Sequence, residues 1–348
     1  MIKLKNNIIK KLTVDINSNI LRIIKILNES SIKIVFVTNR KKNFIGTVTD
    51  GDIRRGLLKG ININSKLSNV VYTKPIYINF TKFSNNALEK KFLDTGQEFI
   101  PVLKNKKIFK IFRNANNIKL KPNKTIENSV VIMAGGQGRR LGQLTKNNPK
   151  PLLKYNKKAL IQHIINKASN QGVKNFFITI FYLKNKIKKY FLKNPNEDIN
   201  INFITEPKPL GTVGAIKYLR NIKKPFILTN CDVISDIDYS NILSYHNKRK
   251  NSYLTIGVKN FKYKNPYGVI RSKNSKFLSF IEKPSIDFKI NAGIYVFSNK
   301  LIDIVKKNKI FELNYLVEFL AKKIKRINIY PIIEDWRDFG EDKINLKE

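Results

Sequence analysis

A glycine-rich stretch near the middle of the chain has the residue types needed to bind phosphate. The stretch reads VIMAGGQGRRLGQLT from Val131, and NPKPLL follows it. Its glycines after the apolar segment are Gly135, Gly136 and Gly138. Because glycine has no side chain, backbone N–H groups there can approach phosphate oxygens. Arg140 adds a planar, permanent charge, and Lys150 lies between two prolines on a restricted backbone. The stretch therefore predicts a phosphate site.

These motifs together carry a family resemblance, although a Gly-Gly-x-Gly turn alone is weak and matches neither the Walker A nor the Rossmann pattern. Gly-Gly-x-Gly-x-Arg-Leu followed by Pro-Lys-Pro-Leu-Leu resembles the signature of the sugar-1-phosphate nucleotidyltransferases, over about residues 129–342. The resemblance implies an enzyme that transfers a nucleoside monophosphate from a triphosphate to a sugar-1-phosphate and releases pyrophosphate. Arg140, Lys150 and Asp232 would be its catalytic residues, and the three loop glycines would contact the nucleotide.

Later motifs follow in the order that the resemblance requires. In EPKPLGTVGAI, the residues Glu206, Gly211 and Thr212 would lie beside the base or the sugar. The alternative is a glycine-rich helix N-terminus, which is itself an anion site. LTNCDVI puts Asp232 directly after an apolar strand, and DWRDFG contains Asp338. The resemblance implies that both carboxylates bind Mg²⁺, which prefers oxygen ligands.

Three further motifs resemble the part of the family that binds the sugar. They read NPYGVI, FIEKP and NAGIYVF. The contacts carried over from them are Gly268, Glu282, Lys283 and Asn291. Each short motif alone is equally typical of a turn or of surface structure, because such motifs match by chance often.

The segments around these motifs alternate between strand and helix patterns. Four segments have strand character, namely SVVIMA, NFFITIF, INFIT and PFILT. Three segments have the apolar spacing of helices, namely ALIQHIINKASNQG, LKNKIKKYFL and GTVGAIKYLRN. This alternation predicts an α/β domain with a Rossmann-like, mostly parallel sheet, which binds ligands at the carboxyl ends of its strands. We expect this nucleotidyltransferase domain to span residues 129–348, after a polar linker at 122–128.

Residues 1–121 contain two related patterns, at about 8–61 and 66–120, which predicts two similar units packed together. The stretch GTVTDGD that ends at Asp52 resembles the signature of cystathionine-β-synthase (CBS) domains, which occur in pairs and often bind adenosine nucleotides. Thr49 and Asp52 are the carried-over contacts with such a regulatory nucleotide. Capping of the following helix explains both residues equally well.

The second unit departs from the CBS signature, because Arg113 and Asn116 stand where threonine and aspartate would, which puts ligand binding there in doubt. A CBS-domain pair joined to such a transferase is similar to bacterial guanylyltransferases that make GDP-sugars for surface glycans, including mannose-1-phosphate and glucosamine-1-phosphate types. That resemblance favours GTP as the nucleoside triphosphate, and a homo-oligomer. Uridylyl, cytidylyl or thymidylyl transfer is the alternative.

The chain is strongly basic, with a formal net charge of +42. Such a charge is typical of nucleic-acid-binding proteins, but these lysines are scattered through every segment rather than clustered on one element. We therefore expect no specific nucleic-acid partner. A basic nucleic-acid-binding protein and an inactive nucleotide sensor are the alternatives from other classes. The presence of Arg140, Lys150, Asp232 and Asp338 disfavours the sensor.

Cysteine and histidine usage limits the other chemistry. The single cysteine, Cys231, excludes an internal disulfide and indicates a small core residue, and two histidines are too few for a His-rich zinc site. The N-terminal sequence lacks the apolar core of a signal peptide, and no run approaches the roughly 20 apolar residues of a membrane span. We expect a soluble, cytoplasmic enzyme with Mg²⁺ as cofactor and no membrane contact.

Overall fold

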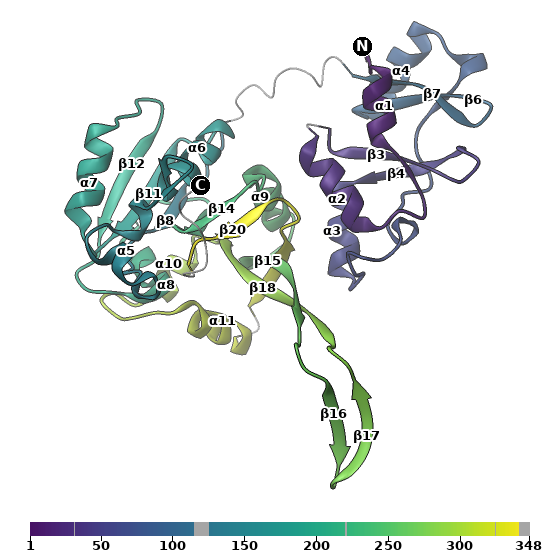
Figure 1. Ribbon diagram of the computed structural model, residues 1–348. Helices are drawn as coiled ribbons and strands as arrows, with labels where there is room; N and C mark the ends of the chain where they lie inside the picture. Colours follow the sequence, from purple (N-terminus) through teal and green to yellow (C-terminus); the bar gives the residue numbers. More distant parts are fainter. Residues whose placement is uncertain (31, 115–124, 220, 324, 341–348) are drawn as a thin grey trace. The chain divides into compact units, whose positions relative to one another are not determined.

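The chain folds as two compact units, residues 1–124 and 125–348 (Figure 1). The computed structural model describes residues 1–30, 32–114, 125–219, 221–323 and 325–340. Within these ranges, no helix is both long enough and apolar enough to cross a bilayer.

Unit 1 contains two β-α-β-β arrangements with the same strand pairing. Its strands are β1 (Ile2–Lys3), β2 (Thr13–Asp15), β3 (Ile34–Thr38), β4 (Phe44–Thr49), β5 (Ile78–Asn79), β6 (Phe99–Lys104) and β7 (Lys107–Arg113). Its helices are α1 (Asn6–Leu12), α2 (Ile20–Glu29), α3 (Asp50–Leu58) and α4 (Asn85–Thr95). β2 lies parallel to β3, which pairs antiparallel with β4, and β5, β6 and β7 repeat this pairing. Helices α2 and α4 form the crossover connections that join the parallel strands β2 and β3, and β5 and β6.

The start of α3 is fixed by a capping box. Asp52 N donates to Thr49 Oγ1 at 3.3 Å, and Thr49 N donates to Asp52 Oδ2 at 2.8 Å. Two of the helix's otherwise unpaired N-terminal donors are thereby satisfied. The structure thus shows the capping role of these residues, and nucleotide binding by them stays a prediction. In the second arrangement Arg113 pairs with Glu98 at 2.7 Å, and Asn116 lies outside the described residues.

Unit 2 is built on a seven-stranded sheet in the order β12-β11-β8-β13-β18-β15-β19. These strands are β8 (Val130–Met133), β11 (Asn175–Ile180), β12 (Asn200–Thr205), β13 (Phe226–Asn230), β15 (Ser252–Lys264), β18 (Ser285–Phe297) and β19 (Arg326–Pro331). β12, β11, β8 and β13 are mutually parallel, whereas β18 is antiparallel to both of its neighbours. The predicted α/β fold with a mostly parallel sheet is confirmed.

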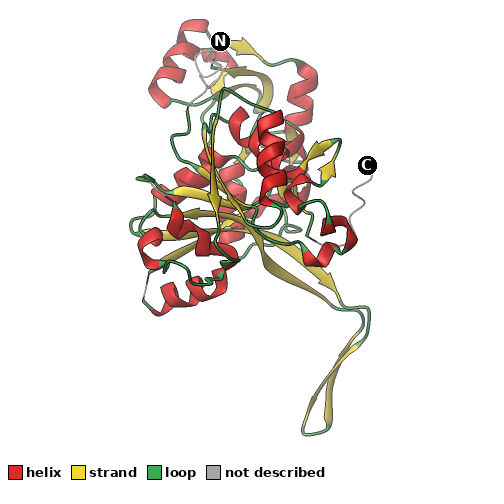
Figure 2. Ribbon diagram, turned by 90° about the vertical axis from the view of Figure 1, so that its left-hand side faces the viewer, coloured by secondary structure: helices red, strands yellow, loops and turns green. Residues whose placement is uncertain are grey.

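Helices cover both faces of this sheet (Figure 2). The helices of unit 2 are α5 (Gln143–Lys146), α6 (Leu160–Asn170), α7 (Lys184–Lys193), α8 (Gly211–Gly214), α9 (Tyr239–Asn247), α10 (Leu301–Ile304) and α11 (Leu313–Lys322). One apolar cluster contains residues of α6, α7 and α9, and the other contains residues of α8, α10 and α11. Val130 and Ile132 of β8 belong to the first cluster and Val131 to the second, as strand alternation requires.

Three short ribbons complete unit 2. They are β9 (Lys154–Tyr155) with β10 (Lys158–Ala159), β14 (Val233–Ser235) with β20 (Trp336–Asp338), and β16 (Val269–Lys273) with β17 (Lys276–Ile281). The β16–β17 ribbon forms the end of a long arm, in which β15 and β18 continue away from the sheet (Figure 1).

The helix predicted over residues 211–221 is wrong in length. α8 contains only four residues and is followed by a 3₁₀ turn, Ala215–Tyr218. Two glycines weaken a helix here because they lose the most backbone entropy on folding. Gly214 also lies against another segment, since a Cβ on it would stand 3.0 Å from the backbone oxygen of Lys309.

Candidate active site

A cavity of about 410 Å³ lies at the carboxyl ends of the parallel strands of unit 2, where the sequence predicts a ligand site. This volume is within the range of small-molecule sites, about 300–1,000 Å³. The predicted residues that line it are Gly135, Gly136, Gly138, Arg140, Lys150, Glu206, Gly211, Thr212 and Asp232. They come from four separate loops, so the fold assembles a single pocket from motifs that are distant in sequence.

Glycine in the loop after β8 leaves room for a buried carboxylate. A Cβ on Gly135 would lie only 2.3 Å from Oε1 of Glu206. Gly138 has a left-handed φ of +66°, and a Cβ there would lie 2.9 Å from the Thr145 side chain. The hydroxyl of Thr145 donates to Gly138 O at 3.0 Å and so fixes the loop. Both glycines are therefore required by geometry.

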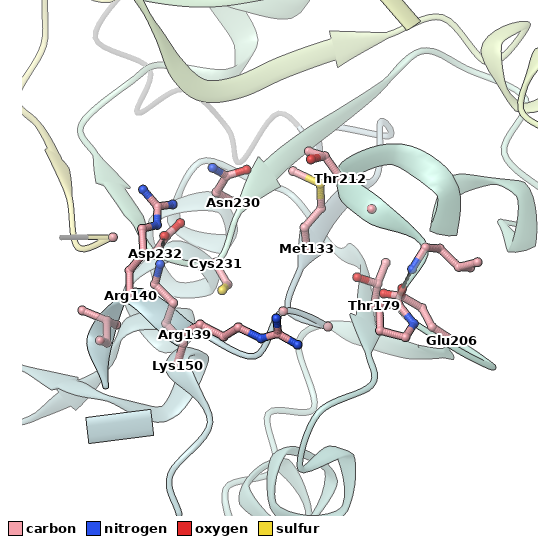
Figure 3. Close-up of a pocket in the computed structure, with 18 residues that line it drawn as sticks. Met133, Arg139, Arg140, Lys150, Thr179, Glu206, Thr212, Asn230, Cys231 and Asp232 are labelled. Atoms are coloured by element: carbon pink, nitrogen blue, oxygen red, sulfur yellow. Dashed lines mark hydrogen bonds and ion pairs between the residues drawn. The ribbon is translucent and has the colours of Figure 1, made fainter. Parts of the chain in front are cut away.

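Glu206 forms one end of the pocket (Figure 3). It directly follows β12 and is 6% exposed. Its Oε2 accepts a hydrogen bond from the backbone N–H of Leu210 at 3.1 Å. Burial raises the pKa of this carboxyl, although this bond and one to Thr179 oppose the rise. Glu206 is thus a buried carboxyl group that is held in one position by its hydrogen bonds.

The other end of the pocket gathers charges of both signs. Figure 3 shows Arg140, Lys150 and Asp232 close together and apart from Glu206. Lys150 Nζ pairs with Asp232 Oδ2, and each side chain is 11% exposed. Lys150 begins a 3₁₀ turn between two prolines, which restricts its backbone. This end therefore combines two cationic side chains with a carboxylate, which is the set of groups that the sequence predicts for phosphate and metal binding.

Asp338 does not line the cavity but lies beside Asp232. β14 and β20 pair antiparallel, and Phe339 N donates to Asp232 O at 2.9 Å. A Cβ on Gly340 would stand 2.8 Å from Asp338 Oδ1 and 3.3 Å from Asp232 Oδ2. The pKa of Asp338 is raised, first by burial and second by the charge of Asp232. The structure therefore brings the two predicted metal ligands to one point.

The donor set at this point fits Mg²⁺. Two carboxylates supply hard oxygen ligands, and a divalent cation would relieve the repulsion that raises the pKa of Asp338. Magnesium usually keeps several waters and binds substrate phosphates, so few protein ligands are needed. The described part of the chain holds no cluster of three or more His, Cys, Asp or Glu side chains placed for a metal.

The four predicted sugar contacts lie in two separate places. Asn291 does not line the pocket, but its Nδ2 donates to the Tyr295 hydroxyl at 2.8 Å. The pKa of Tyr295 is raised first by burial and to a smaller extent by the charges of Asp232 and Asp338, so this pair lies near the carboxylates. The other three predicted contacts, Gly268, Glu282 and Lys283, lie on the arm and do not line the pocket. Their role in binding a sugar stays a prediction.

Several residues of the site were missed by sequence reasoning. Glu312 Oε2 accepts hydrogen bonds from the backbone N–H and the hydroxyl of Thr212, at 3.1 and 2.6 Å, and so positions that loop. Arg139 and Thr179 line the pocket. Cys231 also lines it, and burial raises its pKa, which agrees with its reading as a core residue rather than a nucleophile. Gly340, the last residue of DWRDFG, also lines the pocket, and its sequence context alone predicts no role for it.

This geometry agrees with the family comparison. Residues 129–343 match the family described as Nucleotidyl transferase, and the chain belongs to that family. The match does not extend to the residues before 129, so the resemblance of unit 1 to CBS domains rests on its sequence alone.

Similar proteins include the mannose-1-phosphate guanyltransferase of Yarrowia lipolytica, 35% identical over 188 residues that cover 50% of each chain. The enzyme of the same name from Gibberella zeae is 32% identical over 224 residues, 61% of each chain. This chain thus spans about half to three fifths of the length of these curated relatives. The crystal structure of HddC from Yersinia pseudotuberculosis is 27% identical, with a TM-score of 0.49, and the match covers 62% of this chain and 94% of HddC.

Proposed function

We propose that this chain transfers guanylate from GTP to a sugar-1-phosphate, making a GDP-sugar and pyrophosphate. The observation that carries the proposal is the division of one pocket between a buried carboxylate, Glu206, and a cluster of Arg140, Lys150 and Asp232 (Figure 3). A nucleotide has the matching division between a base and a row of phosphates. The names of the relatives support the same reading.

The chemistry of Glu206 supports guanine as the base. An ionised carboxylate only accepts hydrogen bonds, and its two oxygens can accept two at once. The Watson–Crick edge of guanine has two adjacent donors, N1–H and N2–H₂. Uracil and thymine have one donor between two acceptors, and cytosine has one donor beside two acceptors. A fixed, buried carboxylate therefore favours guanylyl over uridylyl, thymidylyl or cytidylyl transfer.

The other end supports in-line phosphoryl transfer. An oxygen of the sugar-1-phosphate attacks the α-phosphorus, the bond from the α-phosphorus to the bridging oxygen breaks, and pyrophosphate leaves. This reaction depends mainly on alignment and charge neutralisation. In the proposal the loop N–H groups and Arg140 hold the triphosphate, and Lys150 keeps a cation near the α-phosphate. Asp232 and Asp338 would hold Mg²⁺, which neutralises phosphate charge when bound.

The sugar is the least constrained part of the proposal. The relatives' names make mannose-1-phosphate the first substrate to test. Three of the predicted sugar contacts lie on the arm rather than at the pocket, so the pocket residues alone do not discriminate among sugars.

The test is a panel of nucleoside triphosphates and sugar-1-phosphates with pyrophosphate release as the readout. The wild type is expected to prefer GTP over UTP, dTTP and CTP. Glu206→Gln replaces one acceptor by an NH₂ donor, so kcat/KM for GTP should fall on the order of 10²-fold, because a donor then faces the donors of guanine. The loss for UTP or dTTP should be much smaller.

The matched control is Gln137→Ala, a change within the same loop at a residue that does not line this cavity but accepts a hydrogen bond from Arg139 Nε at 2.7 Å. It should retain the preference for GTP. A wild type that uses UTP or dTTP best would contradict the base assignment and leave the transferase assignment intact. Absence of pyrophosphate release with every pair would count against the transferase assignment.

A further inference from the structure

The side chain of Thr212 is bonded to a carboxylate that limits what it can offer to a ligand. Glu312 Oε2 accepts a hydrogen bond from the Thr212 hydroxyl at 2.6 Å and a second from its backbone N–H at 3.1 Å. A carboxylate only accepts hydrogen bonds, and a hydroxyl has one hydrogen and two lone pairs. Both donors of Thr212 are therefore directed to Glu312, and the hydroxyl oxygen has only lone pairs left for the pocket.

The backbone around these two residues fixes their contact. Phe311 N donates to Leu210 O at 2.8 Å, and Val213 N donates to Phe311 O at 3.0 Å. Gly211 has a left-handed φ of +74°, and a Cβ on it would stand only 2.6 Å from Glu312 Oε1. The carboxylate is thus held against the loop by contacts on both sides. The fold therefore sets the direction in which the hydroxyl donates.

Thr212 lies between the two ends of the pocket, with Glu206 at one end and Asp232 at the other (Figure 3). In the proposed function these ends bind the base and the α-phosphate, and in a nucleotide the ribose joins these two groups. The hydroxyl groups of ribose, at its 2′ and 3′ positions, can each donate a hydrogen bond. The ribose ring oxygen and the phosphate oxygens only accept. A ribose hydroxyl is therefore the matching partner for a side chain that offers only lone pairs.

We propose that Thr212, positioned by Glu312, accepts a hydrogen bond from a ribose hydroxyl and so selects ribonucleotides over deoxyribonucleotides. The proposal rests on the proposed function for the place of the ribose, and it adds a specificity that the base assignment does not contain. A site that hydrogen-bonds a substrate hydroxyl rejects the analogue that lacks it, because the polar groups of the site then have no partner. Thr212 is the specificity-determining residue, and Glu312 acts through it as a positioning residue.

The test measures kcat/KM for GTP, 2′-deoxy-GTP and 3′-deoxy-GTP, with pyrophosphate release as the readout. The wild type should use one of the two deoxy analogues less well than GTP by on the order of 10-fold or more. Thr212→Val removes the hydroxyl with little change in shape, so it should use GTP and that analogue equally. Thr212→Ser keeps the hydroxyl, and this matched control should discriminate like the wild type. A fluoro analogue at the same position cannot donate, so it should be used no better than the deoxy analogue.

Two further variants test the positioning role of Glu312. Glu312→Ala frees the Thr212 hydroxyl to donate, so the discrimination between GTP and the deoxy analogue should be lost. Glu312→Gln keeps an acceptor oxygen for Thr212 and should retain most of this discrimination. Thermal melting of each variant is the control for folding.

Three results would overturn the proposal. The first is equal use of GTP and both deoxy analogues by the wild type, or discrimination that survives in Thr212→Val. The second is use of the fluoro analogue as efficiently as GTP, which would show that Thr212 donates. The third is a Thr212→Val effect confined to the KM of the sugar-1-phosphate, which would assign the contact to a hydroxyl of that substrate.

These results differ from a failure of the proposed function. A wild type that prefers UTP or CTP would contradict the base assignment alone, and the same comparison is then made with the deoxy analogues of that nucleotide. Titration calorimetry of the nucleotides without sugar-1-phosphate gives the ratio of their affinities without turnover. A protein that binds GTP and both deoxy analogues equally would overturn the ribose contact even if it releases no pyrophosphate.

Discussion

At the scale of single residues, the site depends on carboxylates whose surroundings give them different tasks. Glu206 is held in place by Leu210 at the end of the pocket assigned to the base. Asp232 and Asp338 meet across a ribbon at the end assigned to phosphate. Gly340 is small because any side chain there would meet both carboxylates. In the proposed function the same chemical group therefore recognises a base at one end and holds a metal at the other, according to its neighbours.

The pKa of one buried residue outside the site leads to a prediction of how protein stability depends on pH. His246 is 2% exposed, and burial lowers its pKa from 6.5 to about 4. Because the folded protein binds this proton less readily than the unfolded protein, the stability from this group is fully present above the unfolded-state pKa. It is lost as the pH falls from the unfolded-state pKa toward the folded-state pKa. The free energy of unfolding should therefore fall by on the order of 2 kcal/mol between pH 7 and pH 4.5 through this group.

Urea denaturation at the two pH values measures this effect. The matched variant is His246→Asn, which cannot gain a proton but can still bond to Thr255, the partner of His246 Nδ1 at 2.8 Å. The variant is expected to be less stable at pH 7 and to lose less stability on acidification. An equal loss in both proteins would show that His246 is not the titrating group.

At the scale of elements, the sequence predicts most helices and strands because apolar periodicity and caps are local signals. α2, for example, begins after the cap Asn19 and buries Ile20, Ile23, Ile24 and Leu27 on one face. The predicted helix after Gly211 failed because its close contact with a segment a hundred residues away is invisible locally. Glu312 was missed for the same reason, since its contact with Thr212 exists only in the folded chain.

The capping box of α3 yields a stability prediction. Asp52→Ala removes the acceptor for Thr49 N and the ion pair with Arg55, so unit 1 should lose about 1 kcal/mol of unfolding free energy. Thermal melting of the full chain should show a lower first transition. Asp52→Asn, which keeps an acceptor, should lose much less. Equal melting of wild type and Asp52→Ala would mean that the cap does not stabilise the helix.

The same two residues carry the nucleotide prediction for unit 1. We propose that an adenosine nucleotide contacts Thr49 and Asp52 there. Titration calorimetry of the full chain with adenosine monophosphate avoids competition from the triphosphate site. The wild type should release heat on saturable binding, and Asp52→Ala should bind at least 10-fold more weakly. No binding by the wild type would leave helix capping as the function of these residues.

At the scale of the whole molecule, the alternation of strand and helix patterns predicted the α/β fold of unit 2, and the motifs predicted nine of the residues that line its pocket. It did not predict the arm, because the motifs around Gly268 and Glu282 contain no information about where their ribbon points. The resemblance implied that those residues lie beside the sugar. The net charge of +42 was equally uninformative about the site, where cations and carboxylates are paired locally.

The most direct test of the central claim is pyrophosphate release by Asp232→Asn, Asp338→Asn and the double variant, at saturating Mg²⁺ with GTP and mannose-1-phosphate. If both carboxylates hold one ion, each single variant should lose on the order of 10²–10³ in turnover, and the double variant should be scarcely worse. Thermal melting is the control for folding. Wild-type turnover by Asp338→Asn, or multiplicative losses in the double variant, would contradict the shared metal site.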